Sequence, residues 1–176
     1  MNSICLIPAR SGSKRIKNKN IINFHNKPMI AWGILKALKS KIFKDVIVST
    51  DSHQIQKIAV NYGAKVPFLR SKKLSSDTAS TRSVVIDSIK RLERLKYKFD
   101  NVCVLYPTSV LLKTADLRKS YKDFCDNYND CNYVFSVNEY PYPIQRSLRI
   151  GNNGRIKMNF PRYRKFQSQD LEKIYH

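Results

Sequence analysis

Short apolar runs of β-forming residues alternate with segments of helical length and period, and this alternation limits the fold more than any other feature. The apolar runs are residues 3–8, 45–50, 65–69, 101–106 and 132–137. The helical segments are residues 28–40, 52–62, 81–96 and 114–128. Strands that are apolar throughout, with helices between them, predict parallel pairing and right-handed crossovers on both sheet faces. We therefore expect an α/β fold with a doubly wound, mostly parallel sheet.

Two helix starts carry their own signals. Pro28 suits the first turn of the helix over 28–40, and Asp51 or Ser52 suits the N-cap of the helix over 52–62. In a doubly wound sheet, ligands bind at the carboxyl ends of the strands, near the point where the strand order reverses. The polar loop that follows the first strand, residues 9–21, is therefore the first place to look for chemistry.

The pattern changes near residue 139, where a proline-rich connection leads into two apolar-alternating runs. These runs flank Asn153 and Gly154, a dipeptide that favours a tight β-hairpin turn. We expect residues 1–138 to form the α/β core and residues 139–165 to form a projecting hairpin arm. Residues 166–176 then begin a returning segment that is incomplete within this sequence.

Composition excludes several classes of protein. Hydrophobic residues make up 42% and charged residues 26% of the chain, which is ordinary for a folded protein. The longest apolar runs are far shorter than the ~20 residues of a membrane span. The sequence also starts without a basic leader, so we expect a cytoplasmic protein. The four cysteines form no CxxC pair, which disfavours a zinc site or a disulfide framework.

The chain is strongly basic, with 33 Lys and Arg against 13 Asp and Glu and a net charge of +20. Such a charge favours nucleic acids, anionic membranes and anionic small molecules alike. The excess is spread along the whole chain, so compositional bias is an equal alternative. Only the stretches KYK and RYRK hint at a patch of cations interleaved with aromatic residues. A nucleic-acid-binding module is therefore kept as a disfavoured alternative.

The loop after the first strand is the main candidate for a binding site. It carries the cations Arg10, Lys14, Arg15, Lys17 and Lys19 around a single glycine, Gly12, which we expect to form a tight turn. Backbone N–H groups and several cations in one loop suit a polyphosphate. The sequence is neither a Walker A motif nor GxGxxG. A solvated basic surface is the alternative reading of such a loop.

The motifs IPARSGSKRIKNKNI, KPMIAW, VIVSTD, VPFLR, LSSDTAST, YPTS, YPIQRSL and SQDLE..YH follow one another along the chain. Together they resemble the cytidylyltransferases that activate nine-carbon acidic sugars with CTP, and the pseudaminic acid branch is the most similar. The resemblance implies a Rossmann-like fold of the nucleotide-diphospho-sugar transferase type. It also implies transfer of CMP from CTP to a 2-keto nonulosonic acid, with release of pyrophosphate and assistance by Mg²⁺.

The resemblance also implies roles for individual residues. The catalytic cations would be Arg10, Lys14 and Lys19. The nucleotide would contact Arg10, Ser11, Gly12, Ser13, Lys14, Lys19, Asn20, Arg70, Thr81 and Tyr106. The sugar would contact Gln145, Arg146 and Gln169. The hairpin arm would exchange across a homodimer, so that its residues serve the partner's site.

Two carboxylates, Asp51 and Asp77, lie near predicted strand ends. For Asp51, capping of the next helix is the simpler interpretation. The relatives hold Mg²⁺ through paired acidic residues beyond the position of His176, so we expect no metal ligands in this sequence. Gln167 stands where the family has an arginine, and a neutral amide cannot make the same bidentate contact. A catalytically deficient protein that binds CTP or a nucleotide sugar is therefore the alternative to an active enzyme.

Overall fold

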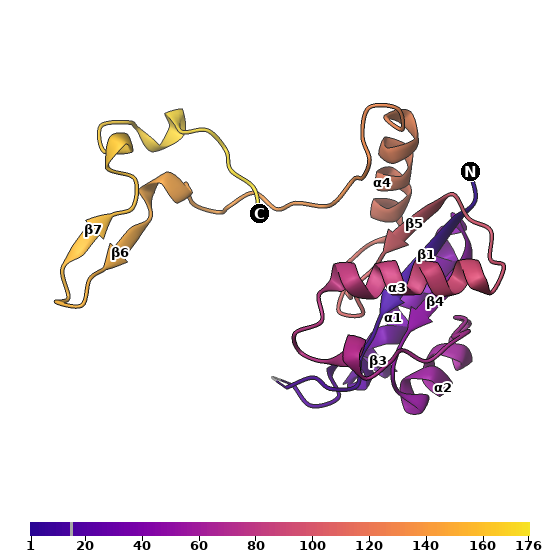
Figure 1. Ribbon diagram of the computed structural model, residues 1–176. Helices are drawn as coiled ribbons and strands as arrows, with labels where there is room; N and C mark the ends of the chain where they lie inside the picture. Colours follow the sequence, from indigo (N-terminus) through magenta and orange to yellow (C-terminus); the bar gives the residue numbers. More distant parts are fainter. Residues whose placement is uncertain (15) are drawn as a thin grey trace. The chain divides into compact units, whose positions relative to one another are not determined.

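The computed structural model describes residues 1–14 and 16–176 (Figure 1). The chain forms two compact units, Met1–Asp130 and Cys131–His176. The boundary therefore falls earlier than the predicted position after residue 138. The predicted arm and the returning segment belong to one unit, together with the stretch 131–138.

The first unit is built on a parallel sheet with strand β1 (Ser3–Pro8) at its centre. Strand β4 (Phe43–Ser49) pairs on one side of β1 and strand β5 (Asn101–Val104) on the other. Beyond β4, residues 65–69 add two parallel bridges, Ile47 to Lys65 and Thr50 to Leu69. Successive crossovers thus move first to one side of β1 and then to the other, which confirms the doubly wound fold.

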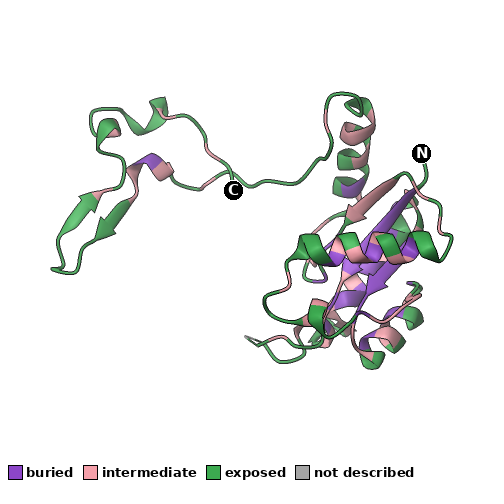
Figure 2. Ribbon diagram, viewed as in Figure 1, coloured by how far each residue is buried: buried purple, intermediate pink, exposed green. Residues whose placement is uncertain are grey.

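Helices cover both faces of this sheet because its strands are apolar on both sides (Figures 1 and 2). On β1, Cys5 and Ile7 belong to a core cluster that also holds Ile34 of α1 (Met29–Ser40) and Ile55 of α2 (His53–Asn61). The intervening Leu6 belongs to a second cluster, formed with helix α3 (Thr81–Arg94). The fourth helix is α4 (Thr114–Asp126). Burial of each such side chain contributes about 1.5–3 kcal/mol to folding.

The remaining elements of the first unit are short. Strands β2 (Asn23–Phe24) and β3 (Lys27–Pro28) form a small antiparallel ribbon. Pro28 is the N-cap of α1, one position before the first turn in which we expected it. Two 3₁₀ turns, η1 (Lys19–Ile21) and η2 (Lys73–Ser75), flank the loops that are important below. No helix among the described residues is long and apolar enough to cross a membrane.

Two predicted strands are wrong. Residues 65–69 make only the two bridges, because Pro67 has no N–H to donate to a continuous ladder. Residues 132–137 form no strand, and Tyr133 and Phe135 are 72% and 69% exposed. A β-forming sequence becomes a strand only where a partner strand and a packing surface are present.

The second unit contains the predicted hairpin. Strands β6 (Leu148–Ile150) and β7 (Ile156–Met158) pair antiparallel, and Gly154 in the turn has a positive φ of 74°. A bridge between Glu139 and Tyr175 joins the two ends of the unit. Its 3₁₀ turns are η3 (Ile144–Arg146), η4 (Pro161–Tyr163) and η5 (Ser168–Asp170).

Candidate nucleotide site

The loop that follows β1 is fixed by the end of the neighbouring strand. Ser11 donates its backbone N–H to Asp51 Oδ1 at 2.9 Å and its hydroxyl to Asp51 Oδ2 at 2.8 Å. Asp51 stands just after β4, so the carboxylate ties the ends of two adjacent parallel strands together. The simpler interpretation of Asp51, as the N-cap of the helix over 52–62, is wrong. Ser52 is the N-cap of α2 and accepts a hydrogen bond from the Ile55 N–H at 3.3 Å.

The far end of the same loop is held by Asn20. This side chain is buried in η1, and its amide donates to the Arg10 carbonyl oxygen at 2.8 Å. A buried amide with a satisfied donor fixes local geometry. The loop therefore has anchors on both sides of its cationic stretch.

Arg10 and Lys14 both pair with one carboxylate from a distant segment. Arg10 Nη2 lies 2.7 Å from Asp77 Oδ1, and Lys14 Nζ lies 2.5 Å from Asp77 Oδ2. Arg10 Nη1 also donates to the Ser76 carbonyl oxygen at 2.6 Å. The Lys14 ammonium, followed by the charge of Arg10, holds the pKa of Asp77 below its usual range.

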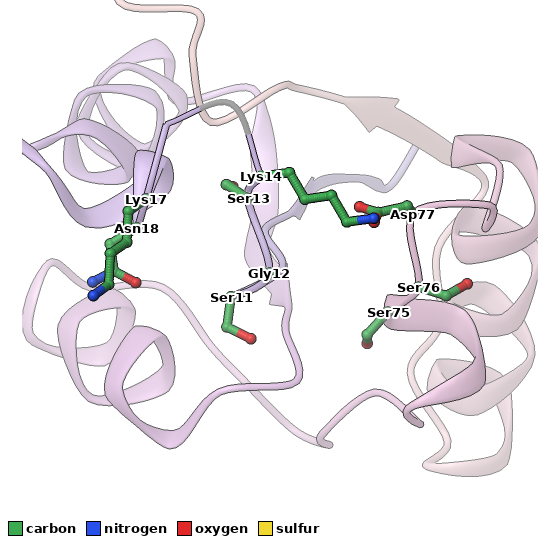
Figure 3. A pocket seen from close by; sticks show the side chains of 9 residues that line it. All are labelled: Ser11, Gly12, Ser13, Lys14, Lys17, Asn18, Ser75, Ser76 and Asp77. Atoms are coloured by element: carbon green, nitrogen blue, oxygen red, sulfur yellow. The ribbon is translucent and has the colours of Figure 1, made fainter.

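A hollow of about 430 Å³ lies between the loop and this distant segment (Figure 3). In Figure 3 the Lys14 side chain extends across the view toward Asp77. One wall comes from the loop and the other from the turn that ends η2. The lining residues are Ser11, Gly12, Ser13, Lys14, Lys17, Asn18, Ser75, Ser76 and Asp77.

Gly12 is the central residue of a tight turn, as predicted, because the Ser13 N–H donates to the Ser11 carbonyl oxygen at 2.9 Å. The positive-φ glycines among the described residues are Gly63 and Gly154, so Gly12 has a backbone that other residues adopt. A Cβ added at Gly12 would meet no atom within 4 Å. The fold therefore does not require glycine here. Glycine also serves where a ligand approaches the backbone closely, and Gly12 lines the hollow.

Arg70 stands beside this region and is only 6% exposed. Its backbone N–H donates to the Thr50 carbonyl oxygen at 2.7 Å, and its Nε donates to Ser75 Oγ at 3.2 Å. Burial lowers the pKa of the guanidinium, while the nearby Asp51 carboxylate acts in the opposite direction. Asp51 thus faces both the loop and a buried cation.

Thr81 and Tyr106 are brought together from two elements. Tyr106 follows β5, and its hydroxyl donates to the Thr81 hydroxyl at 3.4 Å, a long hydrogen bond. Thr81 is the first residue of α3, whose N-cap is Ser80. Both side chains are exposed, so both are available to a ligand.

The structure therefore unites Arg10, Ser11, Gly12, Ser13 and Lys14 in one site. Lys19 is half-buried at the start of η1 and does not line the hollow. Arg15 lies outside the described residues. The sequence motif LSSDTAST contained Ser75 and Ser76, but nothing in it indicated that they would form the opposite wall.

The three predicted sugar contacts belong to the second unit. Gln145 is buried there and donates to the Glu172 carbonyl oxygen at 2.9 Å. The Arg146 guanidinium donates to the Phe166 carbonyl oxygen. Gln169 is exposed and donates to the side chain of Gln167.

The described residues do not fit a dedicated magnesium site. Within residues 1–14 and 16–176, no three His, Cys, Asp or Glu side chains gather as metal ligands. The carboxylates at this edge of the sheet, Asp51 and Asp77, are already bound to Ser11 and to the two cations. Mg²⁺ is usually held by one or two free carboxylates together with substrate phosphates.

A doubly wound sheet with a cationic loop at the carboxyl end of its first strand has the layout of a nucleotide-binding α/β protein. The sequence profile of the cytidylyltransferase family matches residues 4–149. The chain belongs to this family, whose members are nucleotidyltransferases that use CTP.

Individual relatives agree with this assignment. Pseudaminic acid cytidylyltransferase of Campylobacter jejuni subsp. jejuni serotype O:2 is 43% identical over 176 residues, which is all of this chain and 75% of the relative. CMP-N,N'-diacetyllegionaminic acid synthase of Legionella pneumophila subsp. pneumophila is 43% identical over 118 residues, covering 67% of this chain and 51% of the relative. A solved CMP:2-keto-3-deoxy-manno-octonic acid synthetase complexed with CTP has the same fold. Its TM-score is 0.69 at 16% identity, and the match covers 100% of this chain and 71% of that one.

Proposed function

We propose that the chain transfers CMP from CTP to a nine-carbon 2-keto acidic sugar, pseudaminic acid, and releases pyrophosphate. The observation that carries the proposal is the convergence of Arg10 and Lys14 on Asp77, a residue that lines the hollow beside the loop after β1. This hollow lies in a chain that matches a pseudaminic acid cytidylyltransferase along its whole length.

The loop supplies the groups that a triphosphate needs. Arg10 and Lys14 carry the positive charge, and Ser11, Gly12 and Ser13 line the hollow beside them. Lys19 follows in the same segment, and we assign it a phosphate contact as well. Cations aimed at the phosphates neutralise the charge that repels an incoming nucleophile and stabilise the leaving pyrophosphate.

The nucleoside lies toward the neighbouring strand ends in this proposal. Arg70 follows residues 65–69, which bridge to β4. The Tyr106 hydroxyl comes from the segment after β5 and the Thr81 hydroxyl from the first turn of α3. Asn20 acts on the loop, because its amide holds the Arg10 carbonyl oxygen. These groups would orient CTP relative to the cations.

In the reaction, the anomeric hydroxyl of the sugar attacks the α-phosphorus of CTP. A new bond forms between the sugar oxygen and phosphorus, and the bond from the α-phosphorus to the oxygen that bridges to the β-phosphate breaks. Pyrophosphate leaves, and the hydroxyl proton passes to solvent. The loop contributes alignment of the two substrates and neutralisation of charge, which dominate phosphoryl-type transfers.

We assign sugar recognition to the second unit, through Gln145, Arg146 and Gln169. Gln145 Oε1 and Arg146 Nε are buried and have no hydrogen-bond partner among the described residues. Buried polar atoms are normally satisfied, so these atoms support a role in binding. The hairpin of β6 and β7 would join two copies of the chain as a homodimer, the commonest closed oligomer.

We further infer that Mg²⁺ accompanies CTP, where it neutralises phosphate charge. The described residues do not supply its ligand set, so the contribution of this chain to catalysis is the cationic loop itself. The cytoplasm is the expected location, because CTP is available there.

The test is a pyrophosphate-release assay with Mg²⁺ and CTP, run with pseudaminic, legionaminic and sialic acids and repeated with ATP, GTP and UTP. We expect release with CTP and pseudaminic acid, and its loss in Arg10→Ala. The matched control is Arg94→Ala, which removes an exposed arginine at the end of α3. CTP binding without release would favour the nucleotide-binding alternative, and no CTP binding would refute the proposal.

A further inference from the structure

The two cations assigned to the triphosphate are already bound by an anion of the chain itself. Asp77 uses one carboxylate oxygen for Arg10 and the other for Lys14. The other terminal nitrogen of Arg10 donates to the Ser76 carbonyl oxygen. Residues 76 and 77 therefore occupy both terminal nitrogens of the arginine and the ammonium of the lysine, as phosphate oxygens would.

These contacts are placed where they can be exchanged. The Lys14 side chain is 82% exposed and the Asp77 side chain 37% exposed, so water reaches both partners. Solvent-exposed ion pairs contribute little net free energy, because each partner regains hydration when the pair breaks. A triphosphate offers several charged oxygens to the same cations, whereas Asp77 offers two.

We propose that Asp77 is an internal competitor for the phosphate site, which CTP must displace from Arg10 and Lys14 in order to bind. Asp77 then lowers the affinity for the triphosphate. It also re-forms its pairs when pyrophosphate leaves, which disfavours retention of the leaving group. The proposal rests on the proposed function, since it takes the triphosphate of CTP as the ligand of these cations.

The test compares the whole chain with two isosteric variants that remove one negative charge each. Asp77→Asn abolishes the competing anion. Asp126→Asn is the matched control, because Asp126 pairs with Lys122 at 2.8 Å on an exposed face of α4. CTP and pyrophosphate are titrated into each protein by isothermal calorimetry, and far-UV circular dichroism verifies folding.

We expect the Kd for CTP and for pyrophosphate to fall about two- to thirtyfold in Asp77→Asn, the range for two exposed ion pairs. The control should bind CTP with the affinity of the original chain. The affinity of Asp77→Glu, which keeps the charge, should also be close to that of the original chain. Equal or weaker CTP binding by Asp77→Asn would overturn the proposal, since Asp77 would then orient the cations. An equal fall in the Kd of Asp126→Asn for CTP would also overturn it, because the effect would then come from net charge. If none of the proteins bound CTP, the proposed function itself would fall and the competitor with it.

Discussion

Gly12→Ala separates the requirements of folding from those of nucleotide binding. The Gly12 backbone has no positive φ, and an added Cβ meets no atom within 4 Å. Replacing glycine by alanine at such a position reduces the freedom of the unfolded chain and stabilises a protein by about 0.4–1 kcal/mol. For a chain of this size that gain corresponds to a rise in Tm of about 1–4 °C. The variant should therefore fold at least as well as the original chain.

Binding should change in the opposite direction. The new methyl group stands on a residue that lines the hollow, where the phosphates would approach the backbone. Loss of one charge-assisted hydrogen bond costs about 1.5–3 kcal/mol, which corresponds to a 10- to 150-fold increase in the Kd for CTP. Calorimetric titration with CTP measures this increase, and a thermal melt measures the change in Tm.

Gly63→Ala is the reciprocal control. Gly63 has a φ of 91°, and an added Cβ would lie 3.0 Å from Leu38 Cδ1. The left-handed backbone alone costs a residue with a side chain about 1–2 kcal/mol. This variant should melt earlier and bind CTP normally while folded. An unchanged Kd in Gly12→Ala would refute the argument that the loop glycine admits a ligand.

Three further outcomes are expected. Asp51→Ala removes both acceptors of Ser11 and should weaken CTP binding about tenfold, with helix content by circular dichroism unchanged, since a serine caps α2. Leu92→Ala opens a cavity beneath α3 and should lower the free energy of unfolding by about 2–5 kcal/mol in urea titrations; a smaller loss would contradict its burial. The pairs of Asp77, whose pKa Lys14 lowers, stabilise the fold above the unfolded carboxyl pKa of about 3.9. The Tm of the original chain should exceed that of Asp77→Asn from pH 8 to pH 5, and the difference should disappear as the pH falls through the lowered pKa. A difference that grew in acid would contradict the pairing.

The sequence predicted elements whose signals are local. Strand β1 has the predicted bounds, because an apolar run stops at Pro8. The hairpin also follows from its turn dipeptide, with Gly154 at positive φ. The failed strand over 132–137 has the right residues but no partner, and pairing is a property of the fold rather than of a segment.

The site was predicted only in part, because its geometry depends on long-range contacts. The motifs pointed to the cationic loop, yet no local pattern pairs Arg10 with Asp77, which lies in another loop of the chain. The choice between Asp51 and Ser52 as helix cap was also undecidable locally, since both residue types are good caps. The contact of Asp51 with Ser11 decided it.

The central position of β1 has a consequence for synthesis on the ribosome. Both of its partners, β4 and β5, lie downstream in the chain, so the apolar strand has no neighbour when it emerges. At about 5–20 residues per second, roughly 5–20 s pass between the appearance of β1 and the end of β5. Pairing with β4 becomes possible sooner, once residue 49 has been made. Until β5 follows, one edge of the most buried strand of the native sheet stays open, and an open apolar edge is prone to aggregation.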